Sequence, residues 1–303
     1  MQIAKLFSLT LGFLFSYCAS VFCQTGTKTT DTPGEKLVTI GYHKLFIREG
    51  GPKNARYTVI FESGAGGGAN DWTKVISLLP ADIRTIAYDR AGTGKSDQGP
   101  LPRTLTQEVF ELHQLLKILK ITGPVVLVGQ SMGGLLVRLY TDEYGKNVVG
   151  VVLVDPACEN GMLGSFKYGG WVRLREKAIG KPIPNPQLEN TISVGYDSTA
   201  DYMAEEFQKI YLSAIKNPRQ LKDRPLIILG AGKRNQPPGT PDEQWKEIRA
   251  ERDKQVEDFT ILSSNSKFIL DPLSGHNIHK DNPEIVAKSI QEVIHSIVSK
   301  TKF

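Results

Sequence analysis

An α/β fold with a mostly parallel central sheet is predicted by the order of strand-like and helix-like segments along this sequence. Short apolar runs rich in β-branched residues alternate with segments whose apolar residues recur at helical spacing. The strands are apolar along nearly their whole length, which is typical of a parallel sheet covered by helices on both faces. A chain of 303 residues is long enough for one large domain of this class.

The predicted elements follow in a regular order. After a hairpin over residues 37–51, the strands are expected at 57–64, 85–90, 124–129, 147–157, 225–232 and 266–270. The helices are expected at 70–80, 104–121, 131–145, 198–215, 241–262 and 282–298. Gly41 marks the hairpin turn, and Asn70 or Asp71 is the expected cap of the first helix. Pro283 suits the first turn of the last helix.

Residues 159–221 interrupt this alternation, because they lack strong strands and carry Gly, Pro and scattered aromatic residues. They follow the sixth strand of the predicted sheet. We therefore expect a helical cap over the carboxyl edge of the sheet, where ligands bind in open α/β sheets. Residues 37–158 and 222–303 are the expected core.

The first residues differ in composition from the rest of the chain. Lys5 precedes an uncharged apolar run, which ends on smaller residues before a Thr-rich stretch. This layout predicts a cleaved signal peptide over residues 1–23 and a flexible leader over 24–36, hence a periplasmic or secreted protein without stable membrane insertion. An uncleaved membrane anchor is the alternative. Cleavage would leave Cys158 as the one cysteine, so no internal disulfide is expected.

Charge and composition argue against several function classes. The net charge is +5, and the Lys and Arg residues form no concentrated stripe of the kind that binds nucleic acid. The glycine-rich residues 64–68 are not followed by the Lys-Ser or Lys-Thr of a phosphate-binding loop. No Cys/His cluster has metal-site spacing. We expect neither a metal ion nor a cofactor, and the oligomeric state is left open.

The pattern G-x-S-x-G occurs as Gly129-Gln130-Ser131-Met132-Gly133. A predicted strand ends at this point and a helix begins, which is the setting of a nucleophile elbow. Gly129 and Gly133 leave room for a strained serine backbone, and the Met132 amide is a candidate oxyanion donor. The alternative is a glycine-rich turn with an incidental serine.

From residue 37 to its end, the chain resembles the α/β-hydrolase superfamily. The resemblance rests on the serine motif, on "YDRAGTGKSD" at residues 88–97 and on "SGHNIHKDNPEIV" at residues 274–286. It implies an eight-stranded sheet, a cap insertion and Ser–acid–His chemistry.

A serine hydroxyl needs a neighbouring base to become nucleophilic. Of the five histidines, His276 follows the last predicted strand and stands last in the order Ser, acid, His that this fold uses. "SGH" also resembles the histidine loop of the superfamily. His279 is the alternative base.

The acid is the less obvious member of the site. The resemblance places it after the seventh strand, where Asn235 stands, and an amide cannot stabilise an imidazolium ion. In a serine protease, Asp→Asn at the acid lowers turnover by about four orders of magnitude. Asp155 ends the sixth strand at the same sheet edge, and "VDPA" resembles the version found in some lipases. Asp155 is therefore the predicted acid, with Asp242 and Glu243 as alternatives.

The loop after residues 57–62 is expected to complete the oxyanion hole through the amide of Ala65. Where the superfamily usually has His-Gly, this chain has Ser63-Gly64. Glu62 is interpreted either as a buried structural carboxylate or as a group facing the site. Asp89 and Arg90 are interpreted as a structural pair.

These residues predict a serine hydrolase that cleaves small-molecule carboxylic esters through an acyl-enzyme, with thioesters and amides as related substrates. Acyl transfer or carbon–carbon bond hydrolysis on the same fold is one alternative. A non-catalytic binding protein on this scaffold is the other, since fold alone does not determine function.

Overall fold

The computed structural model describes residues 34–158, 206, 209, 210, 212, 213, 216–236, 239 and 241–303, which all belong to the structural unit Thr32–Phe303. The predicted signal peptide at 1–23, most of the leader and nearly all of the predicted cap at 159–221 lie outside the described residues. In the part of the chain that is described, no helix is both long enough and apolar enough to cross a membrane.

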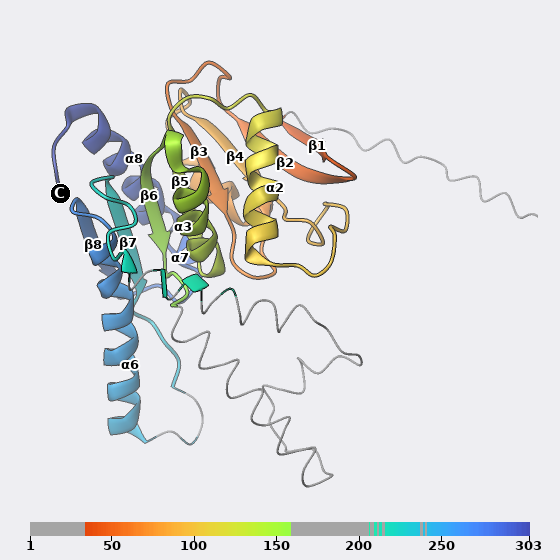
Figure 1. The fold of residues 1–303 in the computed structure, drawn as a ribbon. Coiled ribbons are helices and arrows are strands. Elements are labelled where there is room, and N and C mark those ends of the chain that lie inside the picture. Colours follow the sequence, from red (N-terminus) through yellow and green to blue (C-terminus); the bar gives the residue numbers. More distant parts are fainter. Residues whose placement is uncertain are drawn as a thin grey trace, which may run out of the picture. The chain divides into compact units, whose positions relative to one another are not determined.

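The central sheet has eight strands in the order β1-β2-β4-β3-β5-β6-β7-β8 (Figure 1). The strands are β1 (Glu35–Ile40), β2 (His43–Gly50), β3 (Thr58–Glu62), β4 (Arg84–Tyr88), β5 (Val125–Gln130), β6 (Val148–Val154), β7 (Leu226–Ala231) and β8 (Ser266–Asp271). β2 runs antiparallel to both of its neighbours, β1 and β4, and β3 to β8 are mutually parallel. The predicted mostly parallel eight-stranded sheet is therefore confirmed.

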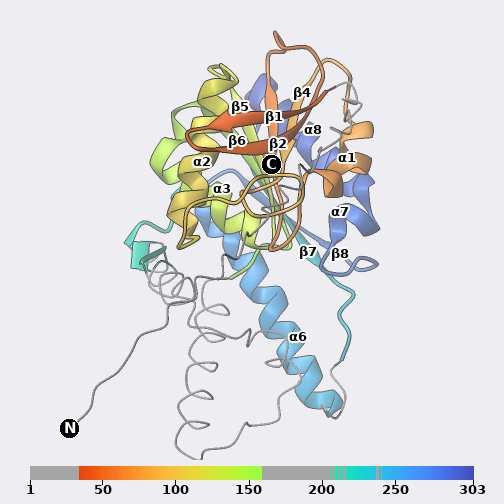
Figure 2. The same ribbon diagram turned by 90° about the vertical axis from the view of Figure 1, so that its right-hand side faces the viewer.

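Helices cover both faces of this sheet, as the apolar strands predict. Figure 2 shows α2 (Leu105–Ile118) and α3 (Met132–Tyr144) on one side, and α1 (Thr73–Ser77), α7 (Ile278–Asp281) and α8 (Pro283–Ser299) on the other. Each side has its own core of fully buried side chains, with Leu127 and Leu135 in the first and Val128 and Val293 in the second. The long helix α6 (Asp242–Glu257) and the 3-10 turn η3 (Asp258–Leu262) connect β7 to β8.

The ends of the elements follow from local chemistry. Gly41 has φ +62° in the β1–β2 turn, and Pro283 stands in the first turn of α8, as predicted. The expected cap at Asn70 or Asp71 is wrong, because a 3-10 turn, η1 (Ala69–Trp72), precedes α1 and is capped by Gly68. The Asp71 carboxylate instead accepts a hydrogen bond from the Gly68 amide at 3.3 Å. β1 begins at Glu35, within the predicted leader.

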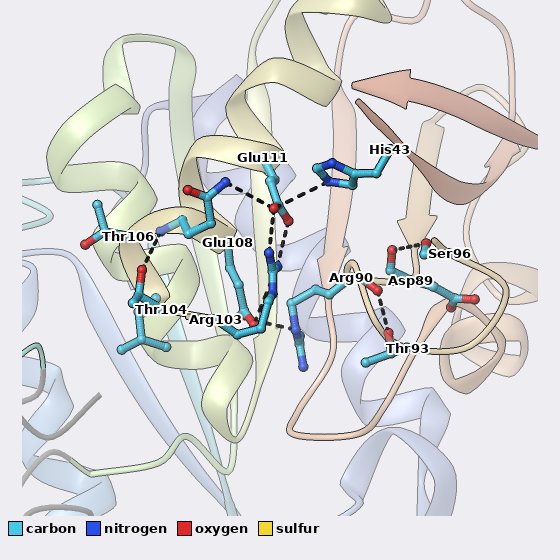
Figure 3. Close-up of polar contacts among 12 residues, drawn as sticks. His43, Asp89, Arg90, Thr93, Ser96, Arg103, Thr104, Thr106, Glu108 and Glu111 are labelled. Carbon is cyan, nitrogen blue, oxygen red and sulfur yellow. Dashed lines mark hydrogen bonds and ion pairs between the residues drawn. The ribbon is translucent and has the colours of Figure 1, made fainter. Parts of the chain in front are cut away.

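A chain of buried and partly buried charges joins the ends of β3 and β4 to α2. Figure 3 shows its part from Arg90 to Glu111. Arg90 Nη1 donates to Glu62 Oε1 at 2.5 Å, and Arg90 Nε lies 3.4 Å from Glu108 Oε2. Arg103 then donates to both oxygens of Glu111, at 2.6 and 2.7 Å. Arg103 Nη2 also lies 3.9 Å from Glu108 Oε1. The signs of the charges therefore alternate along the chain, and each of the three inner charges lies between opposite charges. Such pairing is what makes charge burial tolerable.

Asp89 and Arg90 serve different partners, which corrects the predicted pairing of the two. Asp89 accepts hydrogen bonds from the amides of Ala69 at 2.7 Å and Lys95 at 2.8 Å. Arg90 turns to Glu62 instead. Glu62 is 1% exposed and also accepts from the Tyr88 hydroxyl, so it is a buried structural carboxylate.

The charge chain makes stability depend on pH. Burial raises the pKa of Glu108 from 4.5 to about 7, against the lowering effect of Arg90. Between these values the folded protein holds a proton that the unfolded chain releases, so rising pH favours unfolding. We expect wild type to lose up to about 2–3 kcal/mol of unfolding free energy relative to Glu108→Gln between pH 5 and pH 8. Urea unfolding at both pH values measures this difference.

The matched control for this substitution is Glu247→Gln, at an exposed position on α6. Its unfolding free energy should follow that of wild type across the same pH range. Parallel curves for all three proteins would contradict the raised pKa of Glu108.

Candidate functional site

Ser131 lies between β5 and α3 in a strained backbone conformation. Its φ of +52° and ψ of −119° fall outside the regions that residues with side chains normally occupy. The Ser131 amide donates to Val154 O at 3.1 Å, and its carbonyl accepts from the amides of Gly134 at 2.9 Å and Ala157 at 3.0 Å. Strain of this kind persists only where the surroundings fix the backbone, and here β6 and α3 fix it.

The two glycines of the motif are required by close backbone approach. A Cβ on Gly129 would lie 2.5 Å from the carbonyl oxygen of Gly133. A Cβ on Gly133 would overlap the carbonyl of Glu62 at the end of β3. The glycines therefore let β5, α3 and β3 meet at Ser131, as the sequence pattern predicts.

The structure brings Asp155 and His276 together. Asp155 follows β6 and has no exposed surface, and His276 lies in the loop between β8 and α7. Asp155 Oδ2 is 2.6 Å from His276 Nδ1, although the residues are 121 positions apart. His276 is about half exposed, with a side-chain accessibility of 49%. An imidazole held at Nδ1 by a buried carboxylate is the arrangement that a base needs.

Two hydrogen bonds to backbone carbonyls connect this pair to the segment around Ser131. Gln130, directly before Ser131, donates through Nε2 to His276 O at 3.2 Å. Ala157, two residues after Asp155, donates its amide to Ser131 O at 3.0 Å. β5 and β6 are neighbouring parallel strands, so Ser131 and Asp155 emerge at the same edge of the sheet.

The charge state of Asp155 favours an ordered imidazole. Burial raises the pKa of this carboxyl. The hydrogen bond to His276 and the charges of Arg234 and Arg252 lower the pKa by more than burial raises it, so the net shift is downward. An ionised Asp155 accepts from the Nδ1–H of His276. The lone pair of the neutral ring then lies on Nε2, the nitrogen that faces away from the carboxylate.

The alternative acids have other surroundings. Asn235 is exposed. Asp242 begins α6 and accepts from Gln236 Nε2 at 2.9 Å, and Glu243 pairs with Lys246 at 2.7 Å. Of the carboxylates considered from the sequence, Asp155 is the one that the structure joins to His276.

His279, the alternative base, is a packing residue. It is 2% exposed, and its ring centroid lies 4.7 Å from that of Trp72. Burial lowers the pKa of His279 to about 4, so the ring stays neutral within the core. Among the described residues, no three His, Cys, Asp or Glu side chains gather closely enough to hold a metal ion.

Arg90 fixes the loop that carries Ala65. Its guanidinium donates through Nη1 to Ser63 O and through Nη2 to Gly64 O, both at 2.6 Å. In a trans peptide the N–H points away from the preceding C=O, so the Ala65 N–H points away from Arg90. The loop runs beside the serine, since a Cβ on Gly64 would lie 3.2 Å from Ser131 Cβ.

Ser63 has a structural role that the sequence did not reveal. Its hydroxyl accepts from Trp72 Nε1 at 2.8 Å and donates to Gly68 O at 3.0 Å. These bonds close the glycine-rich loop against η1. Ser63, which stands where the superfamily usually has histidine, therefore stabilises the loop through its side-chain hydroxyl.

Arg234 and Arg252 are further residues of the site that sequence reasoning missed. Arg234 Nη2 donates to Asp155 Oδ1 at 2.9 Å, and Arg252 Nη2 lies 3.9 Å from the same oxygen. Arg234 directly precedes Asn235, in the loop after β7. The contact between Arg234 and Asp155 could have been expected from the pairing of β6 with β7, because the loops after neighbouring parallel strands meet at one edge of the sheet.

Comparisons with known proteins agree with this architecture. Residues 57–210 match the family described as the alpha/beta hydrolase fold. The uncharacterised protein YqjL of Bacillus subtilis is 29% identical over 236 residues, which cover 78% of this chain and 83% of YqjL.

Solved structures show the same fold at lower identity. A probable hydrolytic enzyme from Pseudomonas aeruginosa superposes with a TM-score of 0.59 at 22% identity, over 86% of this chain and 93% of that one. A thermophilic esterase from Thermogutta terrifontis gives 0.58 at 19% identity, over 87% and 98%. At such identities the likeness shows the fold alone. With the family match spanning half of its length, the chain belongs to the α/β-hydrolase fold family.

Proposed function

We propose that this protein is a serine hydrolase that cleaves small-molecule carboxylic esters through an acyl-enzyme on Ser131. The observation that carries the proposal is the 2.6 Å contact between buried Asp155 and His276, at the sheet edge where the strained Ser131 lies. Membership of the α/β-hydrolase fold family supports it.

In the proposed first half-reaction, His276 Nε2 takes the proton of Ser131 Oγ as that oxygen attacks the ester carbonyl. The amides of Ala65 and Met132 donate to the oxyanion of the tetrahedral intermediate. Asp155 stabilises the imidazolium ion of His276. The ester C–O bond then breaks, the proton passes from His276 to the leaving alcohol, and the acyl group stays on Ser131.

In the second half-reaction, His276 takes a proton from water while the water oxygen attacks the acyl carbon. The same amides hold the second oxyanion. Collapse of that intermediate breaks the bond to Ser131 Oγ, which regains its proton from His276, and the carboxylic acid leaves. The proposed sequence needs neither a metal ion nor a cofactor, and thioesters or amides would follow the same steps.

Labelling by a fluorophosphonate probe tests the activated serine directly. We expect the full chain to be labelled stoichiometrically and Ser131→Ala to show no labelling, because an unactivated serine reacts negligibly with such probes. Intact-mass spectrometry measures the extent of labelling of both proteins. A folded wild-type protein that takes up no probe would contradict the proposal and favour a non-catalytic binding role.

Substitution of the acid tests the assignment of Asp155. Asp155→Asn should lower kcat on a short-chain ester by about four orders of magnitude, because the amide cannot stabilise the imidazolium ion. The matched control is Asp242→Asn, at an exposed aspartate on α6, which should keep kcat near the wild-type value. Circular dichroism checks that both variants are folded.

The reverse ranking of the two variants would assign the acid to Asp242, at the start of α6, instead of Asp155. Product analysis with added alcohols distinguishes the related reactions on the same site. Ester products in place of free acid would indicate that acyl transfer replaces hydrolysis.

A further inference from the structure

The carboxylate of Asp155 has two differently occupied oxygens. Oδ2 faces His276 Nδ1 at 2.6 Å. Oδ1 accepts from Arg234 Nη2 at 2.9 Å and from the Ala231 amide at 3.3 Å. The side of the carboxylate away from the histidine is therefore bound by a guanidinium, a permanent positive charge.

Arg234 is itself held in place. Its side chain is 16% exposed, and its Nε lies 3.6 Å from Asp253 Oδ1 on α6. Arg252, the other cation near Asp155, is bonded elsewhere, to Pro156 O at 2.9 Å and to Cys158 Sγ at 2.6 Å. Arg234 thus makes the direct guanidinium bond to Asp155, while Arg252 contributes charge from 3.9 Å.

We propose that Arg234 is a positioning residue of the Ser131–Asp155–His276 site, which fixes the Asp155 carboxylate and limits how strongly it attracts a proton on His276. This inference rests on the proposed function and deepens it. It assigns a task to the loop after β7, which does not supply the acid.

The geometric part of this role follows from the bonds to Oδ1. A carboxylate bound only at Oδ2 can turn about its Cβ–Cγ bond and lose His276. With Oδ1 fixed by Arg234 and Ala231, Oδ2 stays directed at Nδ1. A restrained carboxylate keeps the imidazole oriented, so no further conformational entropy is lost on orienting it in each catalytic cycle.

The electrostatic part has a definite sign. A positive charge at Oδ1 partly neutralises Asp155, so the imidazolium form of His276 is stabilised less than by an isolated carboxylate. Among the described residues, the other charged or titratable groups near the pair include Arg252 and Asp253 of α6 and His279, Lys280 and Asp281 of α7. Asp281 accepts from the Gly275 amide.

Two substitutions of Arg234 separate charge from packing. Arg234→Gln removes the charge and keeps an amide donor, whereas Arg234→Lys keeps the charge. The first measurement is the pH dependence of kcat/KM. The second is an NMR titration of the His276 imidazole in the Ser131→Ala background, where the His276 signal is identified by its absence from His276→Asn. Arg234→Gln should move the acidic limb and the NMR midpoint up by about one pH unit, and Arg234→Lys should leave both near wild type.

The matched control is Arg56→Gln, an exposed arginine, which should leave both measurements unchanged. Wild-type values in Arg234→Gln, or an equal shift in the Lys variant, would overturn the role of the Arg234 charge. The NMR titration needs no turnover. A protein that neither hydrolyses esters nor takes up the probe therefore refutes the proposed function, while the titration still decides the role of Arg234.

Discussion

The carboxylate of Asp155 has no exposed surface, and the site around it is organised by the need to satisfy that buried charge. An unpaired ion in this position would cost several kcal/mol. Its partners come from the ends of other strands: Ala231 is the last residue of β7, Arg234 follows β7, and His276 follows β8. The parallel register of β6, β7 and β8 brings these ends together, so the fold provides the charge compensation that local sequence cannot.

A buried guanidinium, that of Arg90, holds the loop on the other side of Ser131. Arg90 binds the carbonyls of Ser63 and Gly64 and is itself neutralised by Glu62. On each side, then, an arginine fixes groups that the proposed reaction needs, and a carboxylate keeps the arginine in place. Rigid placement of dipoles and charges before the substrate arrives is the largest single source of catalysis in such sites.

Several of these features could be predicted from the sequence, because they depend on short-range patterns. Apolar β-branched runs predict the strands, and the G-x-S-x-G motif between a strand and a helix predicts the elbow at Ser131. Asp155 follows from its place at a strand end. The carbonyls that Arg90 binds and the Asp155 carboxylate that Arg234 binds could not be predicted. They lie 26 or more positions away in the sequence, and each contact depends on the direction in which a loop side chain turns. The same limit applies to His279, whose burial against Trp72 no local pattern shows.

Asn235 and Arg234 together explain why the loop after β7 lacks an acid. A second carboxylate pointing at His276 from that loop would place a like charge beside Asp155, and like charges that share a site raise each other's pKa until one is neutralised. If Asp155 at the end of β6 is the acid, as proposed, the electrostatically favourable side chain in this loop is a cation. Arg234 provides it at 2.9 Å from Asp155, while Asn235 is turned to solvent. Under the proposed assignment, the lack of an acid after β7 is no sign of a damaged site, because the same loop binds the carboxylate of Asp155.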